Sequence, residues 1–209
     1  MELSAKDDLG PLYKSMVASI VPRPIAWVST LGESGQPNLA PFSFFNAVCS
    51  RPPTLLFASG VRGVDGQQKD TGLNVAKTGE FVISVVTEEL AEAMNKTATE
   101  LPPDVNEFEY AGLEAAPSVT VAPPRVAASP VSFECKVSQI VQVGDGAPGS
   151  GYIVIGEVLH LHVDDAILAE NYRVNSDVFH PIGRMSGPRD TKTTDLFELF
   201  REPSQLEPN

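Results

Sequence analysis

Short apolar segments with the two-residue alternation of β-strands dominate this chain. Within residues 25–30, Ile25 and Trp27 fall on one face of a strand, and Ala26 and Val28 fall on the other. Further strands are expected where the chain is similarly apolar, at residues 38–48, 55–58 and 81–86. The last two segments are almost wholly apolar, so we expect them to be buried on both faces.

The clearest pattern is a pair of long alternating segments, residues 131–143 and 152–163, joined by a glycine-rich turn at residues 144–151. Such a pair predicts a β-hairpin. The predicted inward positions of the first strand are Val131, Phe133, Cys135 and Val137, opposite outward Ser132, Glu134, Lys136 and Ser138. The predicted inward positions of the second strand are Ile153, Ile155, Leu159, Leu161 and Val163. Many strands and few helices favour an all-β barrel or sandwich.

Helical patterns are few and short. Thr87 is expected to cap a helix over residues 88–96, and Asp70 or Thr71 to cap one that runs through Lys77 and stops at Gly79. Single turns are expected at residues 106–111 and 165–172. A long proline-rich segment, residues 98–130, is predicted to be functional or to wrap a partner. We expect one domain over residues 1–202 and a disordered tail at 203–209.

Composition narrows the possible functions. The 209 residues carry a net charge of −12, without a basic cluster, which disfavours binding to nucleic acid or to an anionic membrane. An anionic ligand must therefore be held by local positive groups or backbone amides. The amino-terminal sequence lacks the apolar core of a signal peptide. Cys49 and Cys135 have neither disulfide-framework nor zinc-site spacing, so a cytoplasmic protein without a bound metal is expected.

Three stretches carry candidate chemistry. In IVPRPIAWVST, two prolines hold Arg23 on a stiff approach to a strand, although a surface salt bridge is an equally simple role. In PNLAPFSFFNAVCSRPP, Pro41 indicates a strand edge or bulge with freed amides, unless the strand is merely irregular. In KDTGLN, Lys69 precedes the N-terminus of a helix. This helix start either binds a phosphate or is an ordinary helix cap. His160 and His162 share one face, most simply a solvated one. Nucleophile-elbow, P-loop and dinucleotide-fold motifs are missing from the sequence.

In order and spacing, PRPIAWVST, NLAPFSFF, RPPTLLF, KDTGLNV, GEFVISVV and the later blocks through PIGRMSGPRDTKTTDLFELF resemble the flavin reductase-like family over residues 11–202. The resemblance implies an FMN-binding split β-barrel with Greek-key connections. It also implies a homodimer with FMN near the interface, its ring against NLAPFSFFN. The phosphate or ribityl candidates that it implies are Arg23, Ser29, Thr30, Lys69 and Thr71, with Ser59 and Arg62 as weaker ones. The ring-side candidates are Ala40, Pro41, Ser43 and Asn46.

One departure concerns the substrate. Family members often carry a tyrosine after an Arg-aliphatic-Gly-Gly element, whereas this chain has GRMSGPRD there. His180, just upstream, is the residue that we expect to seat a nicotinamide.

The expected function is electron transfer from NADH or NADPH to FMN, with a monooxygenase as a possible recipient of reduced flavin. The alternatives are an FMN-dependent oxidoreductase of the same fold with another substrate, and a non-catalytic FMN-binding dimer. The 98–130 segment gives a further reason to expect a homodimer, because a second copy could bury its apolar residues: Val105, Phe108, Leu113, Val119 and Val121.

Overall fold

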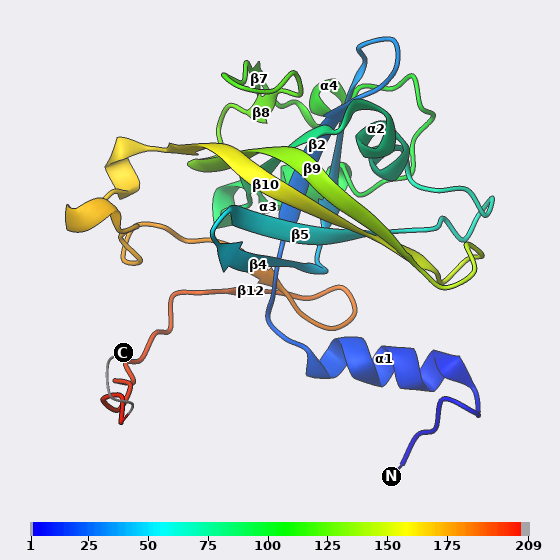
Figure 1. Cartoon of the computed structure of the whole chain (residues 1–209), viewed down its shortest axis with the longest axis horizontal. Coiled ribbons are helices and arrows are strands. Elements are labelled where there is room, and N and C mark those ends of the chain that lie inside the picture. Colours follow the sequence, from blue (N-terminus) through cyan, green and yellow to red (C-terminus); the bar gives the residue numbers. More distant parts are fainter. Residues whose placement is uncertain (1, 206–209) are drawn as a thin grey trace.

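A seven-stranded antiparallel sheet, curled into a barrel, forms the body of the protein (Figure 1). A computed structural model describes residues 2–205, so residues 206–209 of the predicted tail lie outside the described part. The sheet has the order β3-β2-β6-β9-β10-β5-β4. Its strands are β2 (Ala26–Leu31), β3 (Pro37–Phe42), β4 (Phe45–Ser50), β5 (Pro53–Gly60), β6 (Glu80–Val85), β9 (Val131–Val143) and β10 (Gly151–Val163). The all-β prediction is confirmed.

Two small sheets accompany the barrel. One joins β1 (Arg23–Pro24), β11 (Ile182–Arg184) and β12 (Asp190–Lys192), and the other pairs β7 (Ala115–Ala116) with β8 (Arg125–Val126). The helical elements are α1 (Leu9–Ser19), α2 (Asp70–Thr78), η1 (Glu88–Leu90), α3 (Ala91–Lys96), α4 (Glu107–Ala111), η2 (Asp165–Ile167) and η3 (Glu170–Tyr172).

The predicted single strand at 38–48 is wrong in one respect. The chain breaks between Phe42 and Phe45, and its two halves, β3 and β4, lie at opposite edges of the sheet. Pro41 lies within β3, which confirms the edge predicted from its missing amide hydrogen, because an edge strand needs ladder donors on one side only. The break carries the chain from one edge to the other, which the hydrophobic pattern alone does not reveal.

Alternation in β2 divides the core as predicted. Ala26 and Val28 pack in a barrel cluster with Phe57 and Phe81, whereas Ile25 and Trp27 pack in a second cluster. This second cluster lies under α3 and α4 and contains Leu39, Val86, Met94, Phe108, Val126 and Ile182. Both faces of β2 are therefore buried.

The β9–β10 hairpin is confirmed, but the predicted inward face of β10 is wrong. Val154 is fully buried, a Cβ on Gly156 would collide with Phe81, and Val158 packs against the barrel cluster, so the even-numbered residues face the core. The predicted inward Leu159 and Leu161 are exposed. Successive side chains of a strand point to opposite faces, but alternation alone does not show which face meets the core.

The structure corrects three expectations about helices. The cap of α2 is Lys69 rather than Asp70 or Thr71, and it makes no side-chain capping bond, whereas Gly79 ends the helix at φ 71° as predicted. Residues 165–172 form two short 3-10 turns. Helix α1 was not predicted, although Asp8 caps it through Gly10 N. The other helices begin and end close to the predicted residues.

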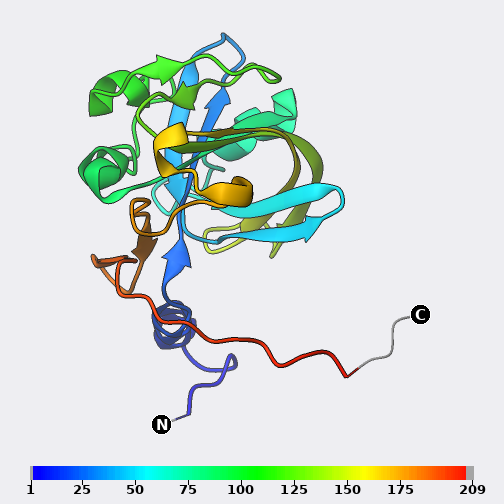
Figure 2. The same ribbon diagram turned by 90° about the vertical axis from the view of Figure 1, so that its left-hand side faces the viewer.

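The 98–130 segment folds over its own barrel, where it forms α4, β7 and β8 (Figure 2). Phe108 and Val121 are buried within the chain, and Val105 and Leu113 are partly buried, whereas Val119 remains 69% exposed. Most of the apolar residues that suggested a covering second copy are therefore covered by the chain itself. The segment also covers Glu134 of β9, which was predicted to face outward and is fully buried. A strand pattern shows which residues share a face, but it cannot show that a loop returns to cover that face.

Candidate functional site

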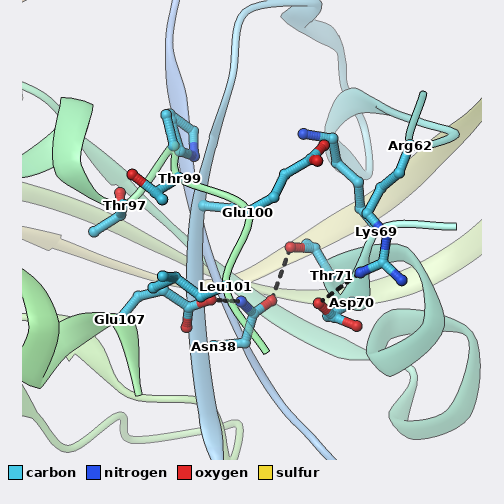
Figure 3. Close-up of a pocket in the computed structure, with 13 residues that line it drawn as sticks. Asn38, Arg62, Lys69, Asp70, Thr71, Thr97, Thr99, Glu100, Leu101 and Glu107 are labelled. Atoms are coloured by element: carbon cyan, nitrogen blue, oxygen red, sulfur yellow. Dashed lines mark hydrogen bonds and ion pairs between the residues drawn. The ribbon is translucent and has the colours of Figure 1, made fainter. Parts of the chain in front are cut away.

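A pocket opens where the first turn of α2 meets the edge strand β3 (Figure 3). Its volume is about 480 Å³, including its open mouth. Five of the predicted cofactor-binding residues line it: Ala40, Pro41, Arg62, Lys69 and Thr71. The other lining residues were not among the predicted cofactor-binding residues. They belong to β3, to α2 and to residues 97–107: Asn38, Asp70, Thr97, Ala98, Thr99, Glu100, Leu101 and Glu107.

Two cationic side chains, Arg62 and Lys69, lie among carboxylates at the α2 end of this pocket. Arg62 is within 2.9 Å of Asp65 and 3.3 Å of Asp70, and the Asp65 hydrogen bond raises the pKa of the guanidinium. Lys69 lies beside Arg62 and the Glu100 carboxylate in Figure 3. The N–H groups of Asp70 and Thr71, which open α2, have no acceptor within the helix and add a partial positive charge. The arrangement suits a phosphate, since it combines two cationic side chains with backbone donors.

Ser59 adds a second observation at the same helix end. Its hydroxyl is buried and, among the described residues, has no hydrogen-bond partner. A Cβ atom on Gly72, in the first turn of α2, would lie 3.2 Å from Ser59 Oγ. A buried polar atom without a partner is costly. Ser59 itself lines neither pocket, but it packs against the turn of α2 that borders the first one.

A buried set of hydrogen bonds, which we name the Glu107–Asn38–Thr71 relay, lies at the other end of the pocket. Asn38 Nδ2 donates to Glu107 Oε1 at 2.8 Å, and Leu39 N donates to Glu107 Oε2 at 3.1 Å. Thr71 Oγ1 donates to Asn38 Oδ1 at 2.9 Å. Burial raises the pKa of Glu107, although these hydrogen bonds oppose that effect. The relay joins α4, β3 and α2, which the sequence alone could not bring together.

A second pocket lies alongside the first and shares Pro41 and Ala98 with it. Ser43, another predicted ring-side residue, lines it, as does Arg184 of β11. Arg184 donates to Gly187 O at 2.8 Å and pairs with Asp190 at 3.4 Å. Both pockets are therefore bordered by the β3 segment that the resemblance assigns to the flavin ring.

The remaining predicted site residues lie elsewhere. Arg23 donates to the carbonyls of Val17, Ile20 and Met185, and so ties the end of α1 to the β11–β12 hairpin. Ser29 and Thr30 are buried; Ser29 donates to the Pro124 carbonyl and Thr30 to Asn38 Oδ1. The last two lie apart from both pockets: Asn46 is exposed on β4, and His180 lies with a ring nitrogen 3.0 Å from the Asp177 carbonyl.

The two-histidine face also differs from its simplest interpretation. His162 Nε2 lies 2.6 Å from Glu134 Oε1, and its ring lies 4.6 Å from that of His160. Within residues 2–205, no group of three or more histidine, cysteine or acidic residues is arranged to hold a metal ion. The same residues contain no helix long and apolar enough to cross a bilayer.

These features define an antiparallel β-barrel with a pocket between its edge strand β3 and the first turn of α2, lined by Arg62 and Lys69. The sequence matches the family model described as "Flavin reductase like domain" over residues 18–183, and the chain therefore belongs to the flavin reductase-like family. Its fold is that of flavin reductase split barrels.

Several known proteins are similar over nearly the whole chain. An uncharacterized protein of Aquifex aeolicus is 46% identical, over 90% of this chain and 93% of its own length. Nitrilotriacetate monooxygenase component B from Bacillus cereus is 31% identical, with a TM-score of 0.89 over 95% of this chain and 98% of its own. The 2-nitrobenzoate 2-nitroreductase NbaA of Pseudomonas fluorescens is 30% identical, with a TM-score of 0.86 over 99% and 98%.

Proposed function

We propose that the protein binds FMN in the pocket between α2 and β3 and acts as a reductase that passes electrons from NADH or NADPH to the flavin. The observation that carries the proposal is the pair of cationic side chains, Lys69 and Arg62, that line this pocket beside the first turn of α2. With the backbone amides of that turn they fit a phosphate monoester. Ser59, whose buried hydroxyl has no partner among the described residues, packs against the same turn. When bound, FMN supplies a ring that accepts hydride from a reduced nicotinamide.

The protein's own part is binding and orientation. Lys69, Arg62 and the α2 amides would hold the phosphate, and Ala40 and Pro41 would border the ring. Hydride transfer needs two rings held in contact rather than a side-chain acid or base, and such positioning supplies several kcal/mol of barrier lowering. His180 remains our candidate for seating the nicotinamide. Replacing His180 by Ala should raise KM for NADH without changing FMN affinity, and an unchanged KM would remove it from the site.

The phosphate assignment is tested with Lys69→Met. Losing a charge-assisted hydrogen bond should weaken FMN binding by about 1.5–3 kcal/mol, and riboflavin binding much less. The matched control is Lys77→Met, which removes a lysine from the opposite end of the same helix, where Lys77 pairs with Glu33 at 2.7 Å. Titration by flavin fluorescence measures both ligands. Equal losses for FMN and riboflavin would show that Lys69 does not bind the phosphate.

Two similar proteins support two different reactions for the reduced flavin. Similarity to a monooxygenase component supports delivery of reduced flavin to a partner oxygenase, whereas similarity to a nitroreductase supports reduction of a second substrate on the bound flavin. Anaerobic stopped-flow bleaching of the flavin by NADH and NADPH tests the reductase step common to both. A rate no faster than that of free FMN would leave a non-catalytic FMN binder. Turnover of nitroaromatics then separates the two catalytic outcomes.

We also propose a homodimer, on different grounds from the sequence. Helix α1 buries none of its side chains in the chain, and it leaves Leu9, Tyr13, Met16 and Ile20 exposed by 45–61%. Figures 1 and 2 show it standing off the barrel. An isolated helix of 11 residues is marginal in water, so a covering surface from a second copy is expected. Light scattering should give twice the 22.3 kDa chain mass, and a monomer that retains FMN would contradict the dimer.

A further inference from the structure

In the Glu107–Asn38–Thr71 relay, Glu107 sets which groups donate hydrogen bonds and which groups accept them. Both oxygens of Glu107 accept hydrogen bonds, from Asn38 Nδ2 and from Leu39 N, as an ionised carboxylate must. The amino group of the Asn38 carboxamide therefore faces Glu107, and its oxygen faces α2. That oxygen accepts the hydroxyl hydrogens of Thr71 and Thr30.

The relay reaches α2 at two positions. Thr71, in the first turn, is bound directly to Asn38, while Asn74, one turn later, donates to Thr30 Oγ1 at 3.1 Å. Thr71, Thr30 and Asn38 are all at least nine-tenths buried, so water does not compete easily for these bonds. The first turn of α2 is thereby fixed against β3. Its own side-chain cap is missing, because the N-cap residue is Lys69.

We propose that Glu107 is a positioning residue of the flavin site, which fixes the orientation of Asn38 and thereby the place of the first turn of α2. The inference rests on the proposed FMN function. The hydroxyl hydrogen of Thr71 is already donated to Asn38, so the phosphate would depend on the α2 backbone amides, Lys69 and Arg62. Glu107 controls where those amides stand, although it need not touch the phosphate.

Hydrogen-bond direction allows a sharp test with two substitutions. Glu107→Gln alone brings an NH₂ group against either Asn38 Nδ2 or Leu39 N, and two donors then face each other. Asn38→Asp alone brings two carboxylates together. In the double variant, the new glutamine oxygen accepts from Leu39 N, and its NH₂ donates to the new aspartate. That aspartate can still accept from Thr71 and Thr30. The pair therefore restores every bond with the charge moved from α4 to β3.

Two readouts are measured on full-length protein. The first is the ratio of FMN to riboflavin affinity by fluorescence titration. Each single substitution should weaken FMN binding about 10- to 100-fold, the range of a lost hydrogen bond to a charged group, with a smaller loss for riboflavin. The second is amide hydrogen exchange of Gly72 and Leu73 without flavin. Both amides donate to Lys69 O, at 2.9 and 3.2 Å, and they should exchange faster in the single variants.

The double variant should recover both readouts to within a few-fold of the parent protein. The control is Glu134→Gln, which disturbs a buried carboxylate outside both pockets and should lower stability without changing the FMN-to-riboflavin ratio. If that ratio falls equally in Glu107→Gln and Glu134→Gln, or if the double variant shows no recovery, Glu107 does not position the site. If the parent protein binds no flavin, the proposed function fails, while the exchange of Gly72 and Leu73 still decides whether Glu107 positions α2.

Discussion

Two buried carboxylates fasten the 98–130 segment to the barrel, and they do so in opposite directions. Glu107 extends from the segment to β3, where it accepts two hydrogen bonds. Glu134 extends from β9 to the segment, where it accepts Val119 N at 2.8 Å and both the N–H and the hydroxyl of Thr120 at 2.6 Å. His162 completes the Glu134 cluster. One carboxylate lines the candidate flavin pocket, and the other lies outside it.

The difference shows how donors compensate for burial. Burial by itself raises the pKa of both groups, since it disfavours a charge. At Glu107 burial prevails, and the pKa is raised. At Glu134 the bonds from His162, Thr120 and Val119 prevail and lower the pKa to about 2. Glu134 therefore has enough donors to offset its burial, whereas Glu107, which lines the candidate pocket, has fewer.

The largest expected effect is the loss of Glu134. Replacing Glu134 by Ala leaves the amides of Val119 and Thr120 without their acceptor and should lower the free energy of unfolding by about 3–5 kcal/mol. Urea denaturation measures the change. Glu114→Ala is the control, because Glu114 is exposed in the same segment and its loss should fall within about 0.5 kcal/mol. Similar losses for the two variants would contradict the role given to the Glu134 cluster.

The contributions of the two carboxylates to folding stability should change with pH in opposite directions. The lowered pKa of Glu134 means that its stabilisation is present above about pH 4.5 and is lost as pH falls toward about 2. The raised pKa of Glu107 means the reverse, with a contribution present below about pH 4.5 and lost as pH rises through the folded pKa. Stability differences from Glu134→Gln and Glu107→Gln, measured across this range, should slope in opposite directions. Slopes of the same sign would refute the comparison.

A smaller effect is expected at His162. Replacing His162 by Ala removes one donor from Glu134 but leaves the three from Val119 and Thr120. The loss should be about 1.5–3 kcal/mol, the scale of one hydrogen bond to a charged group. His160→Ala is the matched control, since within residues 2–205 the His160 side chain contacts the His162 ring but makes no hydrogen bond or ion pair. Thermal or urea unfolding that ranks His160 above His162 would be contrary to expectation.

The smallest effect concerns the helix that carries Glu107. Asn106 caps α4 by accepting from Phe108 N at 3.0 Å. Replacing Asn106 by Ala should cost about 1 kcal/mol of stability. It should also weaken FMN binding slightly, because α4 holds Glu107 in place. If calorimetry shows the stability loss but titration shows no change in FMN affinity, the end of α4 does not influence the pocket.

Sequence patterning carried most of the strand prediction. The alternation of β2 correctly divided Ile25 and Trp27 from Ala26 and Val28, and the glycine-rich turn located the β9–β10 hairpin. It failed at β10, where the predicted inward residues Leu159 and Leu161 point away from the core and Val154 and Val158 meet it. It missed α1, none of whose side chains is fully buried within the chain. Patterning detects the side that meets a core, so a helix without one leaves a weak signal.

For the candidate site, the sequence by itself located the end that we propose for the phosphate. Lys69 and the start of α2 are contiguous, and their chemistry is local, because a helix N-terminus offers donors wherever it lies. The tertiary structure alone decided the other end. Asn38, Thr71 and Glu107 lie far apart in the chain, and they meet only because the 98–130 segment returns over β3. The same segment also buries Glu134. Hydrogen bonds between distant residues depend on how loops pack, so no local pattern in the sequence could predict them.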